Sequence, residues 1–182
     1  PHLKFIFLVR NPIDRAYSQY NMLINWRKSQ LLHEYELFPD KEKLNILLKK
    51  LLDTQNFPFS YWVNLEIEKI RNQENTPIDF FPDFLHRGFY YEQLERYYQF
   101  FPVENILVIE HRELKNNRIS TLRKIEQFLN IPYVDWNAIN LDDKFVSQYN
   151  VKLPSDIRNK LKAFFKPYNE KFYKLIKRNF DW

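Results

Sequence analysis

Residues 3–20 read LKFIFLVRNPIDRAYSQY, and this stretch decides the fold. Its first half, residues 3–9, is an apolar run interrupted by one lysine, and its short length favours a buried parallel strand over a helix. Arg10 ends the run, Asn11 is typical of a helix N-cap, and Pro12 is typical of the first helical position. Aromatic and apolar residues then recur at helical spacing, so the sequence predicts a strand, a tight turn and a helix.

The remainder of the chain alternates helical patterns with one further strand. Amphipathic spacing and proline stops predict helices over residues 41–53, 61–71, 89–101 and 120–129, and from residue 154 onward. A second apolar run, residues 105–109, predicts a second strand. Strands separated by helices predict an α/β fold with a parallel sheet flanked by helices, in a single domain over residues 1–182. Because two parallel strands rarely stand alone, we expect a further strand upstream of Pro1.

The composition excludes several kinds of site. One glycine in 182 residues cannot build a glycine-rich phosphate loop of the Walker or dinucleotide-binding type. The absence of cysteine excludes disulfides and thiolate chemistry, and it favours a cytoplasmic location. The four histidines are too scattered for a metal-ligand spacing, so we expect no metal. No apolar run is long enough to span a bilayer.

The charge pattern favours an anionic ligand over a nucleic acid. The formal net charge of +5 arises from 28 basic and 23 acidic residues that are interleaved along the chain. A protein that binds nucleic acid typically concentrates its basic residues in one tail, stripe or patch. We therefore expect a mildly basic surface and no nucleic-acid partner.

The junction between the first strand and the first helix is a candidate anion site. Ligands of open α/β sheets bind beyond the carboxyl ends of the strands, where this sequence places Arg10, the Asn11 cap and the first N–H groups of a helix. Asn11, then Asp14 or Arg15, and then Ser18 recur at helical spacing on one face, so a guanidinium and a hydroxyl can converge on one phosphate. The alternative is that Arg10 pairs with a nearby carboxylate such as Asp14 and that Ser18 is a solvated helix residue.

Three stretches resemble one enzyme family. Residues 7–20, FLVRNPIDRAYSQY, resemble the 3'-phosphate-binding motif of sulfotransferases that use 3'-phosphoadenylyl sulfate (PAPS), with Arg-Asn-Pro and a serine eight residues after the arginine. Residues 88–97, GFYYEQLERY, resemble the family's Gly-x-Tyr helix. Residues 164–182, FFKPYNEKFYKLIKRNFDW, resemble the terminal signature of its heparan-sulfate-type and bacterial branches. The resemblance covers nearly the whole chain and implies the P-loop-like sulfotransferase fold, incomplete at the N-terminus.

The resemblance also implies a reaction and roles for particular residues. It implies transfer of a sulfuryl group from PAPS to a hydroxyl or amine of a small-molecule or carbohydrate acceptor, with adenosine 3',5'-bisphosphate (PAP) as product. Arg10 and Ser18 are then expected to hold the 3'-phosphate, and Tyr91, or the adjacent Tyr90, to lie near the adenine. The alternative for these tyrosines is packing in the core. Arg15 is expected to brace the fold.

The sequence also departs from the family pattern. The closing signature has Gly, Asp and Gly where this chain has Lys177, Asn179 and Asp181. The loop that covers the nucleotide retains Lys144 and Lys152 but lacks its glycine. The loop that holds the 5'-phosphosulfate, its lysine and the general base cannot be located, so we expect the catalytic residues upstream of Pro1 and no activity from this chain alone. The alternative is a non-catalytic module that binds PAP or a sulfated glycan.

Overall fold

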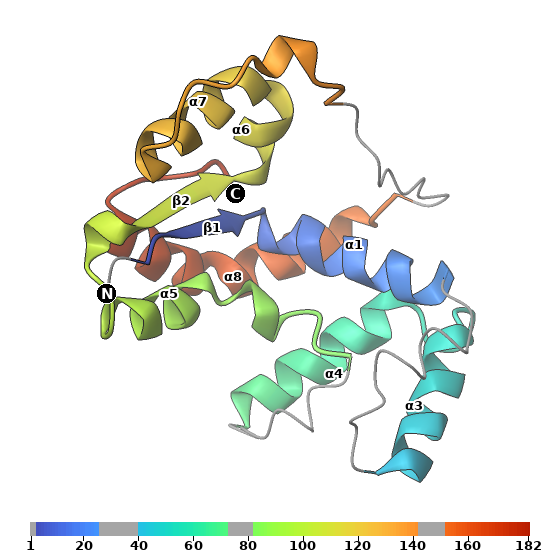
Figure 1. Ribbon diagram of the computed structural model, residues 1–182. Coiled ribbons are helices and arrows are strands. Elements are labelled where there is room, and N and C mark those ends of the chain that lie inside the picture. The colour runs from blue at the N-terminus through green and yellow to red at the C-terminus, as the bar shows by residue number, and fades with distance from the viewer. Residues whose placement is uncertain (1–2, 26–39, 73–81, 142–151) are drawn as a thin grey trace. The chain divides into compact units, whose positions relative to one another are not determined.

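The computed structural model describes residues 3–25, 40–72, 82–141 and 152–182 (Figure 1). These residues group into two compact units. The first contains residues 3–10, 90–141 and 168–181, and the second contains residues 11–25, 40–72, 82–89 and 152–167 together with Trp182. The single domain expected over residues 1–182 stays a prediction.

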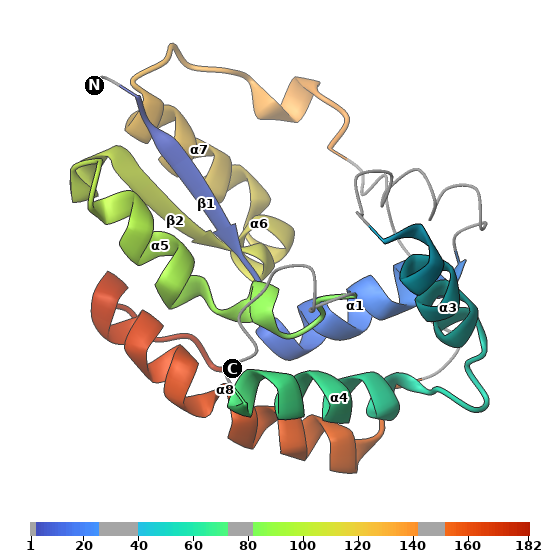
Figure 2. The same ribbon diagram turned by 90° about the horizontal axis from the view of Figure 1, so that it is seen from below.

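A parallel pair of strands lies at the centre of the first unit. Strand β1 (Phe5–Val9) pairs with β2 (Ile106–Glu110) along the full length of both, and the two arrows lie side by side in Figures 1 and 2. Both predicted strands and the parallel sheet of the α/β fold are thereby confirmed. The further strand expected upstream of Pro1 stays a prediction.

Helices of the first unit cover both faces of this strand pair. They are α5 (Tyr90–Tyr98), α6 (His111–Asn116), α7 (Arg118–Leu129) and the last part of α8 (Ser155–Ile176). On one face, the rings of Phe5 and Phe7 contact Tyr97 of α5, with centroids 5.4 and 6.1 Å apart. On the other, Lys4 Nζ donates a hydrogen bond to the carbonyl of Phe128 in α7. This division follows from the alternation of side chains along a strand.

The second unit is built from helices. They are α1 (Pro12–Asn25), α3 (Lys41–Leu52), α4 (Phe59–Arg71) and the first part of α8. The rings of Tyr20, Phe59 and Phe84 lie 5.1 to 5.8 Å apart in the core. Helix α4 runs beside the first part of α8 (Figure 2), and Lys160 Nζ of α8 donates a hydrogen bond to Asn64 Oδ1 of α4. Aromatic rings therefore form part of the core of this unit.

The predicted helices are confirmed, with small shifts at their ends. The helix expected from residue 61 begins at Phe59, and the helix expected to reach residue 101 ends at Tyr98. The sequence analysis missed α6, because its six residues follow β2 without any turn signal between them. Such short elements carry too few residues for a recognisable period.

Gly88 stands at a position where a larger side chain would not fit. It ends a short 3-10 helix (His86–Gly88), and a Cβ placed on it would lie 2.8 Å from Pro12 Cβ and 2.9 Å from Phe165 Cε1. Its φ angle is not positive, so its backbone conformation does not demand glycine. The close approach of two neighbouring side chains therefore explains why the only glycine of the chain stands at this position.

Lys177 ends α8 in the left-handed conformation, with φ 53°. The Arg178 N–H donates to the Tyr173 carbonyl at 3.2 Å, which is the bond expected when a left-handed residue closes a helix. Glycine adopts this conformation without steric cost, whereas a lysine Cβ approaches the backbone. We expect Lys177→Gly to raise the free energy of unfolding by about 1 kcal/mol, measured by urea denaturation.

Lys162→Gly is the matched control for this substitution. Lys162 is exposed in the interior of the same helix, where glycine costs about 1 kcal/mol, so this variant should be less stable than the wild type. A loss of stability in both variants would contradict the role assigned to the conformation of Lys177.

Candidate functional site

Arg10 is the first residue beyond β1, at the carboxyl end of the strand pair. Strand pairing ends at Val9 and Glu110, and Arg10 itself is half-buried. The Tyr90 hydroxyl bonds to both backbone groups of Arg10: it accepts from the N–H at 3.3 Å and donates to the carbonyl at 2.8 Å. The structure thus places Arg10 where the sequence predicted it, with its main chain held from α5.

Helix α1 begins as predicted, but its cap changes the expected anion site. Asn11 Oδ1 accepts hydrogen bonds from the N–H groups of Ile13 at 2.9 Å and Asp14 at 3.4 Å. Pro12, the first helical residue, has no N–H to offer. The N–H groups that we had expected to face an anion are therefore engaged by the cap. The anion contact predicted at this site therefore rests on side chains, and it stays a prediction.

Asp14, the carboxylate considered as a partner for Arg10, is engaged by another arginine. Arg158 NH2 lies 3.0 Å from Asp14 Oδ1, and both residues belong to the second unit. Among the described residues of the first unit, no carboxylate pairs with the guanidinium of Arg10. The alternative in which Arg10 serves only as a structural ion-pair partner is weakened accordingly.

Ser18 and Arg15 lie on α1 in the second unit. Ser18 is half-buried. Because Arg10 belongs to the first unit, convergence of Arg10 and Ser18 on one phosphate stays a prediction. The guanidinium of Arg15 donates to Gln19 Oε1 at 3.0 Å and also to the carbonyl of Phe84. These bonds confirm that Arg15 braces the fold.

The two adjacent tyrosines of α5 have different surroundings. Tyr90 is 6% exposed, and its ring lies 5.6 Å from that of Phe172, so the alternative of core packing is confirmed for Tyr90. Tyr91 is half-buried, its hydroxyl donates to Glu95 at 2.5 Å, and Lys171 Nζ lies 5.9 Å from its ring centroid. The hydrogen bond to Glu95 raises the pKa of Tyr91. The contact of Tyr91 with adenine stays a prediction.

Glu66 is a buried carboxylate that the sequence analysis missed. It is 1% exposed on α4 and accepts hydrogen bonds from the N–H groups of Phe84 at 2.9 Å and Leu85 at 2.7 Å. Burial raises its pKa to about 8, although the two N–H bonds act in the opposite direction. A signal did exist: Glu66 stands seven residues after Phe59, within the apolar stripe of the helix.

Several side chains hold the segment that leads to Gly88. Besides the bonds from Phe84 and Leu85 to Glu66, Gln19 Nε2 donates to the Pro82 carbonyl at 3.0 Å. Helices α1 and α4 of the second unit therefore both fix residues 82–85 by hydrogen bonds to the backbone. Without regular secondary structure there, these side chains satisfy groups that a helix or sheet would otherwise satisfy.

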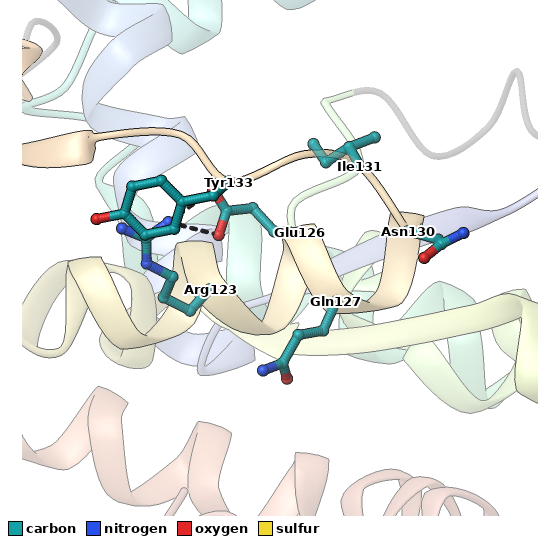
Figure 3. Close-up of a pocket in the computed structure, with 6 residues that line it drawn as sticks. All are labelled: Arg123, Glu126, Gln127, Asn130, Ile131 and Tyr133. Atoms are coloured by element: carbon teal, nitrogen blue, oxygen red, sulfur yellow. Dashed lines mark hydrogen bonds and ion pairs between the residues drawn. The ribbon is translucent and has the colours of Figure 1, made fainter.

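A separate pocket of about 340 Å³ lies at the end of α7 in the first unit (Figure 3). It is lined by Arg123, Glu126, Gln127, Asn130, Ile131 and Tyr133. The guanidinium of Arg123 lies 2.7 Å from the Glu126 carboxylate and 3.8 Å from the Tyr133 ring centroid. Because its charges compensate one another, this pocket differs from the anion site that the sequence predicts.

Other expectations concern a metal, a membrane span and the covering loop. The described part of the chain holds no cluster of three or more His, Asp or Glu side chains arranged for a metal ion, and the absence of a metal stays a prediction. None of the described helices is long and apolar enough to cross a membrane. Lys144 of the covering loop lies outside the described residues, whereas Lys152 is described and exposed.

Comparisons with known proteins agree with the resemblance. A family model described as "Sulfotransferase domain" matches residues 1–144. The chain is 25% identical over 228 residues to the membrane-associated sulfotransferase kil1 of Dictyostelium discoideum, covering 98% of this chain and 48% of the relative. It is 23% identical over 203 residues to the human heparan sulfate glucosamine 3-O-sulfotransferase 5, a match that covers 99% of this chain and 49% of the relative.

A solved structure shares the fold. The crystal structure of a sulfotransferase from Alicyclobacillus acidocaldarius matches with a TM-score of 0.61 at 24% identity, covering 97% of this chain and 56% of that one. This match confirms the predicted fold class. The chain spans about half the length of the curated relatives that it matches.

Proposed function

Because the chain belongs to the sulfotransferase domain family, we propose that it takes part in sulfuryl transfer from PAPS and supplies the part of the site that holds the donor's 3'-phosphate. In this reaction a hydroxyl or amine of the acceptor forms a bond to the donor sulfur. The bond between that sulfur and the 5'-phosphate oxygen breaks, PAP leaves, and the acceptor proton passes to a general base. We place the base and the lysine that stabilises the departing phosphate outside these 182 residues.

The position of Arg10 is the observation that supports the proposal. It stands at the carboxyl end of a parallel strand, where α/β folds bind ligands, and Asp14 is engaged by Arg158. A guanidinium can hold a phosphate through two parallel charge-assisted hydrogen bonds. Ser18 is proposed to add a directional hydroxyl donor to the same phosphate.

The acceptor is proposed to be a small molecule or a carbohydrate. The human relative is named for its action on heparan sulfate glucosamine. The formal net charge of +5 of this chain suits an anionic acceptor, because a mildly basic surface raises the local concentration of anions.

Arg10→Ala tests the proposed phosphate contact. Calorimetric titration of the protein in its full natural length with PAP should show an affinity reduced by roughly 10- to 150-fold, because a charge-assisted contact is worth about 1.5 to 3 kcal/mol. Adenosine 5'-monophosphate (AMP), which lacks the 3'-phosphate, should bind the wild type and the variant equally.

Arg96→Ala is the matched control, because Arg96 is an exposed arginine of the same unit on α5. This variant should bind PAP as the wild type does. Unchanged PAP affinity in Arg10→Ala would refute the assignment of Arg10. PAP binding without any sulfuryl transfer from PAPS would instead favour the non-catalytic binding module.

A further inference from the structure

The main chain of Arg10 is held by a single side-chain hydroxyl. Strand pairing stops one residue earlier, at Val9 and Glu110, so Arg10 is not itself a paired residue of the ladder between β1 and β2. The Tyr90 hydroxyl accepts from this N–H at 3.3 Å and donates to this carbonyl at 2.8 Å. A phenol can serve as donor and acceptor at once, so one group satisfies both backbone atoms.

Tyr90 is itself firmly placed. It is the first residue of α5, it is 6% exposed, and its ring packs against Phe172 with centroids 5.6 Å apart. A tyrosine side chain has two rotatable angles to the ring, and burial restricts both of them. The hydroxyl is therefore a fixed point against which the backbone of Arg10 is aligned.

We propose that Tyr90 is a positioning residue for Arg10, which fixes the direction in which the guanidinium leaves the backbone toward the 3'-phosphate of the donor nucleotide. This inference rests on the proposed function of Arg10. A clamp on both the N–H and the carbonyl restrains the φ and ψ angles of Arg10, and these angles set the direction of its Cα–Cβ bond. A side chain that starts from a fixed direction loses less conformational entropy when it binds.

The neighbouring Tyr91 has a different set of contacts. Its hydroxyl donates to Glu95 on the same helix, and Lys171 lies against its ring. Tyr90 and Tyr91 are thus consecutive residues with separate roles: the first reaches the backbone of Arg10, and the second is the one predicted to contact adenine. The test must therefore report on the 3'-phosphate alone.

Tyr90→Phe removes the hydroxyl and keeps the ring. In the full-length protein we expect PAP affinity to fall roughly 3- to 10-fold, while the affinity for AMP stays unchanged. The ratio of the two affinities is independent of the fraction of folded protein, so a purely structural defect would not change it. Tyr98→Phe, on the same helix and half-buried, is the matched control and should leave the ratio unchanged.

A double-mutant cycle with Arg10→Ala completes the test. If Tyr90 acts through Arg10, Tyr90→Phe should have no further effect on PAP affinity once the guanidinium has been removed. Equal losses for PAP and AMP, or the same PAP loss in both backgrounds, would overturn the positioning role. An effect of Arg10→Ala without one of Tyr90→Phe would overturn this inference alone, whereas no effect of Arg10→Ala would overturn the proposed function as well.

Discussion

Glu66→Ala is expected to lower the free energy of unfolding by about 3 kcal/mol. The substitution leaves the N–H groups of Phe84 and Leu85 buried without the acceptors that they have at 2.9 and 2.7 Å. Each buried donor without a partner costs about 1 to 3 kcal/mol, and the lost side-chain volume adds to this cost. Urea denaturation at pH 6, followed by circular dichroism, measures the change.

Glu68→Ala provides the matched control for the loss of a carboxylate from α4. Glu68 lies two residues further along the same helix and is exposed, so its removal should change the stability by less than about 0.5 kcal/mol. Similar losses in the two variants would mean that Glu66 contributes through helix charge and not through residues 84 and 85.

Features with a local cause were predictable from the sequence. The first strand is an apolar run that ends before Arg10, Asn11 caps the next helix, and Pro12 begins it. Each of these features depends on residues close to one another in the sequence. The same holds for the leucine spacing of α3, where a stripe of apolar residues predicts both the helix and its buried face.

Contacts between distant residues were not predictable in this way. Tyr90 reaches the backbone of Arg10 across 80 residues of sequence, and Glu66 reaches Phe84 across 18. The apolar stripe of α4 indicates that Glu66 is buried, but nothing in its spacing identifies the N–H groups that it accepts from. Such partners depend on how separate elements pack.

Two hydrogen-bonding patterns compete at the start of α1. A helix N-terminus offers free N–H groups to an anion, and an asparagine cap offers its own oxygen to the same groups. Asn11 takes the N–H groups of Ile13 and Asp14. The residue that allowed the helix start to be predicted is therefore the residue that removes the backbone from the anion site, and Arg10 gains importance in consequence.

The contribution of Glu66 to the stability of the protein should fall as the pH rises from about 4.5 to about 8. Burial raises the pKa of Glu66 from 4.5 to about 8, with Asp83 acting in the same direction and Arg15 in the opposite one. Between these two values the folded state holds a proton that the unfolded state has released, so each pH unit costs up to about 1.4 kcal/mol. The contribution is therefore complete below pH 4.5 and lost above pH 8.

Glu66→Gln isolates this contribution, because glutamine has nearly the same shape and does not titrate. The unfolding free energy of both proteins is measured by urea denaturation from pH 5 to pH 9. Over this range the wild type should lose roughly 3 to 5 kcal/mol of stability relative to Glu66→Gln. All other titrating groups are common to both proteins and cancel in the difference. Parallel profiles for the two proteins would show that Glu66 ionises at its ordinary pKa, which means that its two N–H bonds offset the cost of burying its charge.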